Sequence, residues 1–291
     1  MIREFPDIPL WTALVTPFDD KGGLDIGAFE RLVSTQVSAG VRGLLMFGST
    51  GEASTLSEDE KSRLMVSLER LKGAASVMVG ITHNDTRVAC ERAKAAADWG
   101  ADVLLVAPPY YNKPSQAGML EHFRALHEAS PLPIMLYNIP SRVGVSMDIN
   151  TLRELAKLPG MMGLKEASAD LALSARLAPH LPIWCGDDPL IVPYMSVGAL
   201  GAISVTSNLF PRHFLALIEA QSSGRHEDAR RLNLELAELF PLLFCESNPM
   251  GIKAAMAHKG LLKNSLRLPL VSMSEPNTAR LYRSLDALRI S

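Results

Sequence analysis

One lysine in this chain of 291 residues stands where a lysine can act as a nucleophile. Lys165 ends GMMGLK (160–165), a short apolar segment typical of a strand that is buried on both faces. Burial disfavours the charged ammonium and lowers its pKa, and the neutral amine can then form a Schiff base with a carbonyl compound. Two structural interpretations stay open at this point: the side chain reaches solvent, or it pairs with a carboxylate such as that of Glu166.

Hydroxyl groups occur at comparable places. Tyr137 interrupts PIMLYNIP (133–140), the preceding apolar segment, so in an adjacent strand about 4.8 Å away its phenol would lie beside the lysine amine as a general acid or base. Ser49 and Thr50 lie in the turn GSTGE (48–52), whose backbone N–H groups can bind a carboxylate. The alternatives are a packed tyrosine with a bonded hydroxyl, and a turn whose hydroxyls only cap the next helix.

Further candidates follow other apolar segments. Tyr111 lies in the loop PPYYNKPS (108–115), where an aromatic side chain packs locally, contacts another subunit or lines a site. Arg142 is able to bind a carboxylate through two parallel hydrogen bonds, or it is an ordinary surface arginine. Asp187 and Asp188 fit either a metal site or the N-terminal cap of a helix.

Metal chemistry has little support in the sequence. Of the seven histidines only His83 follows a predicted strand, and the chain contains neither HxH nor HExxH. The three cysteines form no CxxC, and no serine lies in GxSxG. We therefore expect no metal ion, and we disfavour a metal-dependent barrel hydrolase.

The elements that position these residues follow one alternating pattern. Eight short apolar segments rich in Val, Ile, Leu and Met read as buried strands: 11–17, 43–48, 76–80, 102–108, 133–140, 160–165, 182–186 and 201–205. Segments with helical spacing lie between them, and GxGxxG and GxxxxGK[ST] are both absent. The pattern predicts an α/β fold, a (β/α)8 TIM barrel, whose functional residues lie at the carboxyl ends of the strands.

Local signals refine this prediction. Helices are expected at 26–40, 57–73, 85–100 and 116–129, with a capping box at Ser57 and Glu60 and helix-ending glycines at Gly40, Gly73 and Gly100. After about residue 225 the strand pattern stops, and 224–240, 248–260 and 274–289 all read as helices. The sequence thus predicts a barrel domain, 1–224, with a small all-helical C-terminal domain, 225–291.

Charge and hydropathy exclude several classes of protein. There are 29 Lys and Arg against 31 Asp and Glu, a formal net charge of −2, which provides no dense positive surface for nucleic acid. The uncharged stretch 189–211 is interrupted by Pro193, Gly198 and Gly201 and reads as core rather than as a membrane span. The first residues lack the apolar run of a signal peptide, so we expect a cytoplasmic protein.

Taken together, the motifs resemble those of the dihydrodipicolinate synthase / N-acetylneuraminate lyase family of pyruvate-dependent class I aldolases. The resemblance covers nearly the whole chain, in one order: ALVTPF (13–18), GSTGE, PPYYNKPSQ, YNIPSRVG, GLKEAS, CGDD, GAISVTSN and SNPMGIKAA (247–255). It implies that Lys165 forms a covalent imine with pyruvate, that Tyr137 moves protons to and from it, and that Ser49 and Tyr111 relay them. It also implies that the reaction requires no separate cofactor.

The same resemblance implies the binding residues. Thr50 would hold the pyruvyl carboxylate, Arg142 the carboxylate of aspartate semialdehyde, and the carbonyls of Gly186 and Ile203 would line the site. The tyrosine matched by Tyr111 usually reaches across a tight dimer interface in this family, which implies a homotetramer built as a dimer of dimers.

Few residues distinguish the two branches of this family, the lyases and the synthases. Ser49 and YNIP (137–140) look like the lyases, whereas Arg142 and PYYNKPSQ look like the synthases. Because Arg142 is a charged group that selects the second substrate, we favour condensation of pyruvate with L-aspartate 4-semialdehyde to 4-hydroxy-tetrahydrodipicolinate, on the diaminopimelate route to lysine. The alternatives are a lyase for N-acetylneuraminate or a sugar acid and, from another class, a binding barrel without turnover; the latter would need no proton relay.

Feedback by L-lysine is a further expectation from the resemblance. Family members that bind lysine place it at a dimer cleft, near positions that match seven residues here: Ala53, Ser54, Glu58, Lys61, Asn84, Val88 and Tyr110. Val88 stands where sensitive enzymes carry a glutamate, and Lys61 adds a like charge. We therefore expect weak or absent inhibition.

Overall fold

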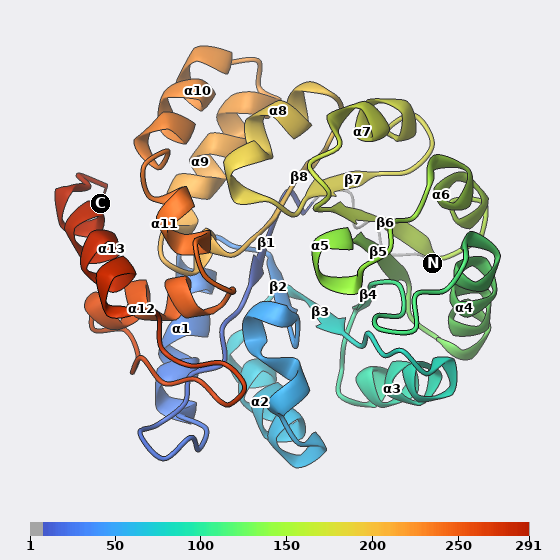
Figure 1. Ribbon diagram of the computed structural model, residues 1–291, viewed down its shortest axis with the longest axis horizontal. Helices are drawn as coiled ribbons and strands as arrows, with labels where there is room; N and C mark the ends of the chain where they lie inside the picture. Colours follow the sequence, from blue (N-terminus) through green and yellow to red (C-terminus); the bar gives the residue numbers. More distant parts are fainter. Residues whose placement is uncertain (1–7, 291) are drawn as a thin grey trace.

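Eight parallel strands close into a barrel in the computed structural model, which describes residues 8–290 (Figure 1). Each strand pairs with its neighbours along the chain, and β8 pairs with β1. The strands are β1 (Leu10–Ala13), β2 (Gly43–Met46), β3 (Ser76–Gly80), β4 (Val103–Val106), β5 (Ile134–Asn138), β6 (Met161–Glu166), β7 (Ile183–Cys185) and β8 (Gly201–Ser204). The predicted TIM barrel is confirmed, and every predicted strand is present.

The strands are apolar throughout because both of their faces are buried. Side chains of one set fill the inside of the barrel, among them Trp11, Met78, Met135 and Trp184. The alternate set, which includes Leu44 and Leu136, packs beneath the surrounding helices. This two-sided burial explains why the strands read as continuous hydrophobic runs rather than as alternating ones.

The four helices predicted in the first half of the chain are confirmed, as α1 (Ile26–Ser38), α2 (Glu58–Leu71), α3 (Thr86–Asp98) and α4 (Gln116–Ala129). The capping box at the start of α2 is formed in full by Ser57 and Glu60. Gly40, Gly73 and Gly100 all have positive φ, which a residue without Cβ adopts at no steric cost.

Short 3-10 turns and further helices complete the barrel. Turns of 3-10 helix follow three of the strands: η2 (Ser49–Gly51) and η3 (Ala53–Thr55) follow β2, η4 (Asp188–Leu190) follows β7, and η5 (Thr206–Asn208) follows β8. The helices of the second half are α5 (Pro140–Val143), α6 (Ile149–Leu155), α7 (Leu171–Leu177), α8 (Ile191–Ser196) and α9 (Pro211–Ser222).

Up to residue 290, the last one that the structure describes, the elements after α9 are all helices, as the sequence predicts. They are α10 (His226–Glu235), α11 (Phe240–Phe244), α12 (Met250–His258) and α13 (Glu275–Ala287), and the last three gather at one side of the barrel (Figure 1). The division of the chain at residue 225 into two domains stays a proposal. Within residues 8–290, no helix combines the length and the apolar character that a membrane crossing requires.

Asn208 joins the first strand to the last. Its amide oxygen accepts from the backbone N–H of Val15 (3.2 Å), and its amide nitrogen donates to the carbonyls of Ala13 and Val205 (both 2.8 Å). Asn208 is 2% exposed, so these backbone groups have no water to replace it. Asn208, within the uncharged stretch 189–211, thus helps to close the barrel between β1 and β8.

We predict that Asn208→Leu lowers the free energy of unfolding by about 3 kcal/mol, because each buried backbone group left unpaired costs about 1–3 kcal/mol. Urea unfolding followed by circular dichroism measures the change. Asn150→Leu, at an exposed position on α6, is the control and should stay within about 0.5 kcal/mol of the parent. A loss below 1 kcal/mol for Asn208→Leu would contradict this role.

Candidate active site

Strands β5 and β6 bring the two central residues together. In their parallel register Tyr137 lies directly opposite Lys165, and Asn138 opposite Glu166. Because side chains alternate across a strand, Tyr137 and Lys165 share one face and the other pair shares the opposite face. The ammonium nitrogen of Lys165 lies 4.3 Å from the centroid of the Tyr137 ring. The sequence predicted this neighbourhood correctly.

Lys165 is 5% exposed, so the interpretation as a lysine that reaches solvent is wrong. Burial lowers its pKa to about 8, with the Arg142 guanidinium acting in the same direction and Asp188 opposing both. At pH 7 about a tenth of such amines are neutral, roughly 200-fold more than at the ordinary pKa of about 10.4. The lysine is therefore available as a nucleophile near neutral pH.

Gly186, at the end of β7, makes room for this lysine. A Cβ at position 186 would lie 2.9 Å from Cε and 3.0 Å from Cγ of Lys165. Any side chain here would push the lysine stem out of place. Gly186 also lines the cavity that holds the amine, as expected.

Two acidic residues near Lys165, Glu166 and Asp188, have hydrogen-bond partners elsewhere. Glu166 accepts from the Asn138 amide (2.9 Å) and from the backbone N–H of Ser168 (2.6 Å), on the opposite face of β6. Asp188 accepts from the backbone N–H groups of Val205 (3.2 Å) and Thr206 (2.7 Å) beyond β8. Burial raises the pKa of both carboxyls. Lys165 is thus not ion-paired with Glu166.

Among residues 8–290, no group of three or more His, Cys, Asp and Glu side chains is arranged to hold a metal ion.

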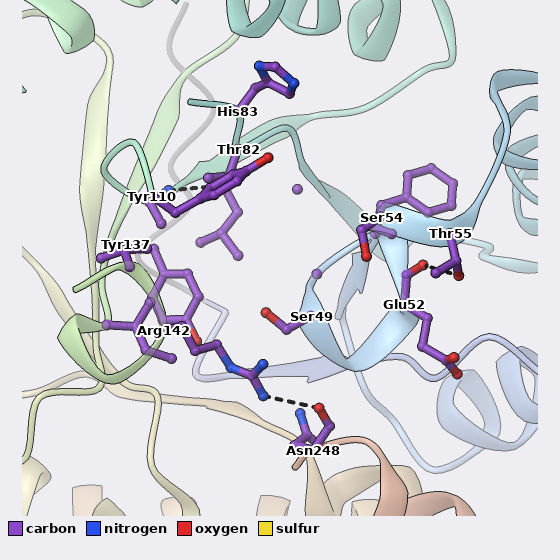
Figure 2. Close-up of a pocket in the computed structure, with 18 of the residues that line it drawn as sticks. Ser49, Glu52, Ser54, Thr55, Thr82, His83, Tyr110, Tyr137, Arg142 and Asn248 are labelled. Carbon is purple, nitrogen blue, oxygen red and sulfur yellow. Dashed lines mark hydrogen bonds between the residues drawn. The ribbon is translucent and has the colours of Figure 1, made fainter. Parts of the chain in front are cut away.

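Two adjoining cavities open at the carboxyl ends of the strands. The inner one, about 220 Å³, contains Lys165 and Gly186. The outer one is about 570 Å³ and reaches His83 and Tyr110 (Figure 2). The two share a set of lining residues that includes Gly48, Ser49, Leu105, Tyr137, Ile139, Arg142 and Asn248. A small inner chamber with the amine therefore continues into a wider entrance.

Three polar residues that line the inner cavity are joined by hydrogen bonds. The Asn248 amide donates to the hydroxyl oxygen of Thr50 (2.9 Å), and the Arg142 guanidinium donates to the Asn248 carbonyl (3.1 Å), as Figure 2 shows for the second bond. The Thr50 hydroxyl, which accepts one hydrogen bond, keeps its own proton for a ligand. Arg142 likewise keeps donors for a ligand, since a guanidinium has five N–H groups.

Sequence reasoning missed Asn248 as a site residue. It lies in the predicted helical extension, just before α12, where the rule about strand ends does not apply. The motif SNPMGIKAA was the only signal that included it.

Ser49 is exposed and lines both cavities, and Figure 2 shows it between Arg142 and the turn that follows β2. Tyr137 is buried, and burial raises the pKa of its phenol above the ordinary value. The phenol consequently stays protonated at neutral pH and can donate. Ser49 and Tyr137 thus both line the cavities at the strand ends, where the sequence predicts them.

Two predicted residues do not line either cavity within this chain. The Tyr111 side chain is 87% exposed, on a residue with φ of 72°, while its neighbour Tyr110 lines the outer cavity. Ile203 is 1% exposed in the barrel interior. A role for Tyr111 therefore depends on a second subunit, and the predicted roles of both residues stay proposals.

Four of the seven positions matched to lysine binding line the outer cavity, namely Ala53, Ser54, Lys61 and Tyr110. Lys61 is buried there and pairs with Glu58 at 2.7 Å. The expectation of weak inhibition stays a prediction.

The chain is similar to proteins of known name over nearly its whole length. The description of the matching family is "Dihydrodipicolinate synthetase family", over residues 9–288. A protein of an Exiguobacterium species named 4-hydroxy-tetrahydrodipicolinate synthase is 42% identical over 280 residues, 94% of this chain and 96% of that one.

Solved structures agree with this result. The 4-hydroxy-tetrahydrodipicolinate synthase of Methylacidiphilum fumariolicum is 38% identical, with a TM-score of 0.92 over 96% of this chain and 94% of that one. The chloride-inhibited dihydrodipicolinate synthase of Acinetobacter baumannii, complexed with pyruvate, is 36% identical, with a TM-score of 0.94 over 97% and 99% of the two chains. Sequence and structure thus agree that the chain belongs to the dihydrodipicolinate synthetase family.

Proposed function

We propose that this protein condenses pyruvate with L-aspartate 4-semialdehyde and forms 4-hydroxy-tetrahydrodipicolinate, a step towards diaminopimelate and lysine. The observation that carries the proposal is the buried Lys165 amine beside Tyr137 in the inner cavity, with Thr50 and Arg142 on its wall. The names of the full-length relatives support the same activity. The pyruvate complex of the Acinetobacter relative supports pyruvate as the first substrate.

The reaction begins with the neutral amine of Lys165, which adds to C2 of pyruvate. Loss of water gives a protonated imine, whose positive nitrogen makes the pyruvyl methyl group acidic. The carboxylate of pyruvate accepts hydrogen bonds from the Thr50 hydroxyl and from the N–H groups at the start of the GSTGE turn. The N–H groups of Gly51 and Glu52 are already bonded within that turn, to the carbonyls of Gly48 and Ser49.

Proton transfers at the imine fall to Tyr137. Its phenol gives a proton to the departing hydroxyl and later takes one from the methyl carbon, which leaves an enamine. Ser49 connects the phenol to the outer cavity, and Tyr111 of a second subunit completes the relay in a homotetramer. Gly186 borders the inner cavity, whereas the predicted contribution of Ile203 is not part of this wall.

The second substrate enters through the outer cavity. The enamine carbon attacks the aldehyde carbon and forms the new C–C bond, while the aldehyde oxygen takes a proton. The amino group of this substrate then attacks the imine carbon, which closes the ring and releases the Lys165 amine. Arg142 orients the aldehyde by binding its carboxylate, and this charged contact favours the semialdehyde over the neutral polyol chain of a sugar acid.

A paired substrate assay tests the proposal. We expect the purified protein to consume pyruvate with L-aspartate semialdehyde and to release no pyruvate from N-acetylneuraminate. Arg142→Leu should lower kcat/KM for the semialdehyde roughly 10- to 100-fold, the loss of a hydrogen bond to a charged group, while pyruvate still forms an adduct on Lys165. Cleavage of N-acetylneuraminate with no use of the semialdehyde would identify a lyase instead.

The pH dependence of imine formation tests the state of Lys165. Since the amine has a lowered pKa of about 8, borohydride trapping with pyruvate should accelerate almost tenfold between pH 6 and 7 and level off above pH 8 to 9. Mass spectrometry locates the adduct on Lys165. Lys165→Ala should give none, whereas Lys263→Ala, at a surface position, should trap normally. A rate that still climbs towards pH 10 would indicate an ordinary lysine.

Tyr137→Phe should lower kcat by roughly 10²–10⁴-fold, the usual loss when a general acid and base is removed. The matched control is Tyr194→Phe, because Tyr194 is fully buried on α8 and lines neither cavity. Steady-state assays of both variants make the comparison. Turnover of Tyr137→Phe within threefold of the parent enzyme would remove the phenol from the mechanism.

A further inference from the structure

A buried ion pair that the reaction does not use lies directly behind the active-site turn. The Lys253 ammonium donates to the Glu52 carboxylate at 2.5 Å, and the two side chains are 0% and 1% exposed. Glu52 ends the GSTGE turn, and Lys253 comes from α12, 201 residues further along the chain. The pair therefore joins the helical extension to the loop that carries Thr50.

The rest of the pair's surroundings come from the extension and from the loop after β1. Lys253 also donates to the Ser265 carbonyl (2.8 Å) and lies 4.2 Å from the centroid of the Phe18 ring. The second carboxylate oxygen of Glu52 accepts from the backbone N–H of Arg267 (3.0 Å). The Arg267 guanidinium in turn lies 4.3 Å from the Phe18 ring centroid. Both ends of the pair are thus fixed by further contacts.

The turn itself is held in an unfavourable backbone conformation. Glu52 has φ 50° and ψ 40°, the left-handed region that few residues other than glycine adopt. Glu52 lines the outer cavity, and its carboxylate lies on the side of the turn opposite to Arg142 and Tyr137 (Figure 2). A residue in this conformation needs contacts that over-determine it, and the ion pair supplies them.

Two contacts from one segment flank Thr50. Asn248, just before α12, donates to the Thr50 hydroxyl, and Lys253, within the first turns of α12, binds Glu52 two residues beyond it. Because α12 is a rigid element whose seven leading residues are all buried, a shift at one contact moves the other. The position of the Thr50 hydroxyl thus depends on both.

We propose that Glu52 and Lys253 are positioning residues, which set the GSTGE turn so that Thr50 faces the carboxylate of pyruvate. The inference rests on the proposed function, because it assigns a substrate group to the turn. Stability alone does not explain a buried ion pair here. The desolvation of two charges offsets most of their attraction, and apolar side chains of similar volume stabilise a fold as well or better. What an ion pair adds over apolar packing is a fixed geometry.

The test measures how imine formation depends on pyruvate concentration. Glu52→Gln combined with Lys253→Met replaces the pair by uncharged groups of similar size. We expect the pyruvate concentration for half-maximal borohydride trapping to rise roughly tenfold, since a carboxylate contact is weakened. The limiting trapping rate and the KM for the aldehyde should stay within threefold of the parent values.

Single variants should differ in severity. Lys253→Met leaves the Glu52 carboxylate buried without its counter-charge, whereas Glu52→Gln leaves an amine that can lose its proton. Burial already lowers the pKa of Lys253 to about 8. Glu52→Gln is therefore the milder change, and it decides the question if the double variant does not fold. Lys263→Met removes the exposed pair with Asp20 and is the matched control, with no expected change.

The outcomes separate this inference from the proposed function. If the parent protein forms no adduct on Lys165, the function itself is wrong. If the parent traps pyruvate normally and the variants show the same half-saturation within twofold, the positioning role is wrong. If the limiting trapping rate and the apparent affinities for both substrates all decrease together, the pair has only a structural role.

Discussion

The desolvation of one amine is the constraint on which the site depends. An ammonium group in water is useless as a nucleophile at neutral pH, and the barrel changes this by surrounding Lys165 with other strands rather than with solvent. The interior that destabilises the charge must also leave room for a substrate. Gly186 meets both demands, because the absence of a Cβ lets the lysine stem lie against the backbone of β7 while the amine faces the inner cavity.

Neighbouring charges adjust this effect without cancelling it. Asp188 lies close enough to favour the ammonium, but its carboxylate is held by the backbone N–H groups of Val205 and Thr206. Glu166 follows Lys165 in the chain, yet strand alternation turns it to the other face, where Asn138 binds it. Had either carboxylate paired directly with Lys165, the pKa of the amine would rise and its neutral fraction would fall. The same alternation that builds a strand therefore keeps the nucleophile unpaired with its nearest acid in sequence.

The fold could be predicted almost completely from the sequence, because eight buried strands leave eight apolar runs and because Gly40, Gly73 and Gly100 mark helix ends. The site could be predicted where strand ends define it: Lys165, Tyr137, Ser49, Thr50, Arg142 and Gly186 all line the cavities. Asn248 and the Glu52–Lys253 pair could not be found in this way, since their contacts join residues about 200 positions apart and start from a helix whose pattern only indicates burial. Tyr111 is exposed on this chain, so its predicted role across a subunit interface stays a proposal.

The contacts of Asn248 and of the Glu52–Lys253 pair show that the helical extension reaches the site. A barrel of eight βα units is closed without it, and Asn208 already joins the first strand to the last. The extension nevertheless reaches the mouth, where Asn248 binds both Thr50 and Arg142, the residues proposed to hold the two substrate carboxylates. One residue from outside the barrel thereby fixes the spacing between two binding groups that come from different strands. A side chain at a strand end still has the conformational freedom of the loop that carries it. A rigid helix buried against those loops removes much of that freedom.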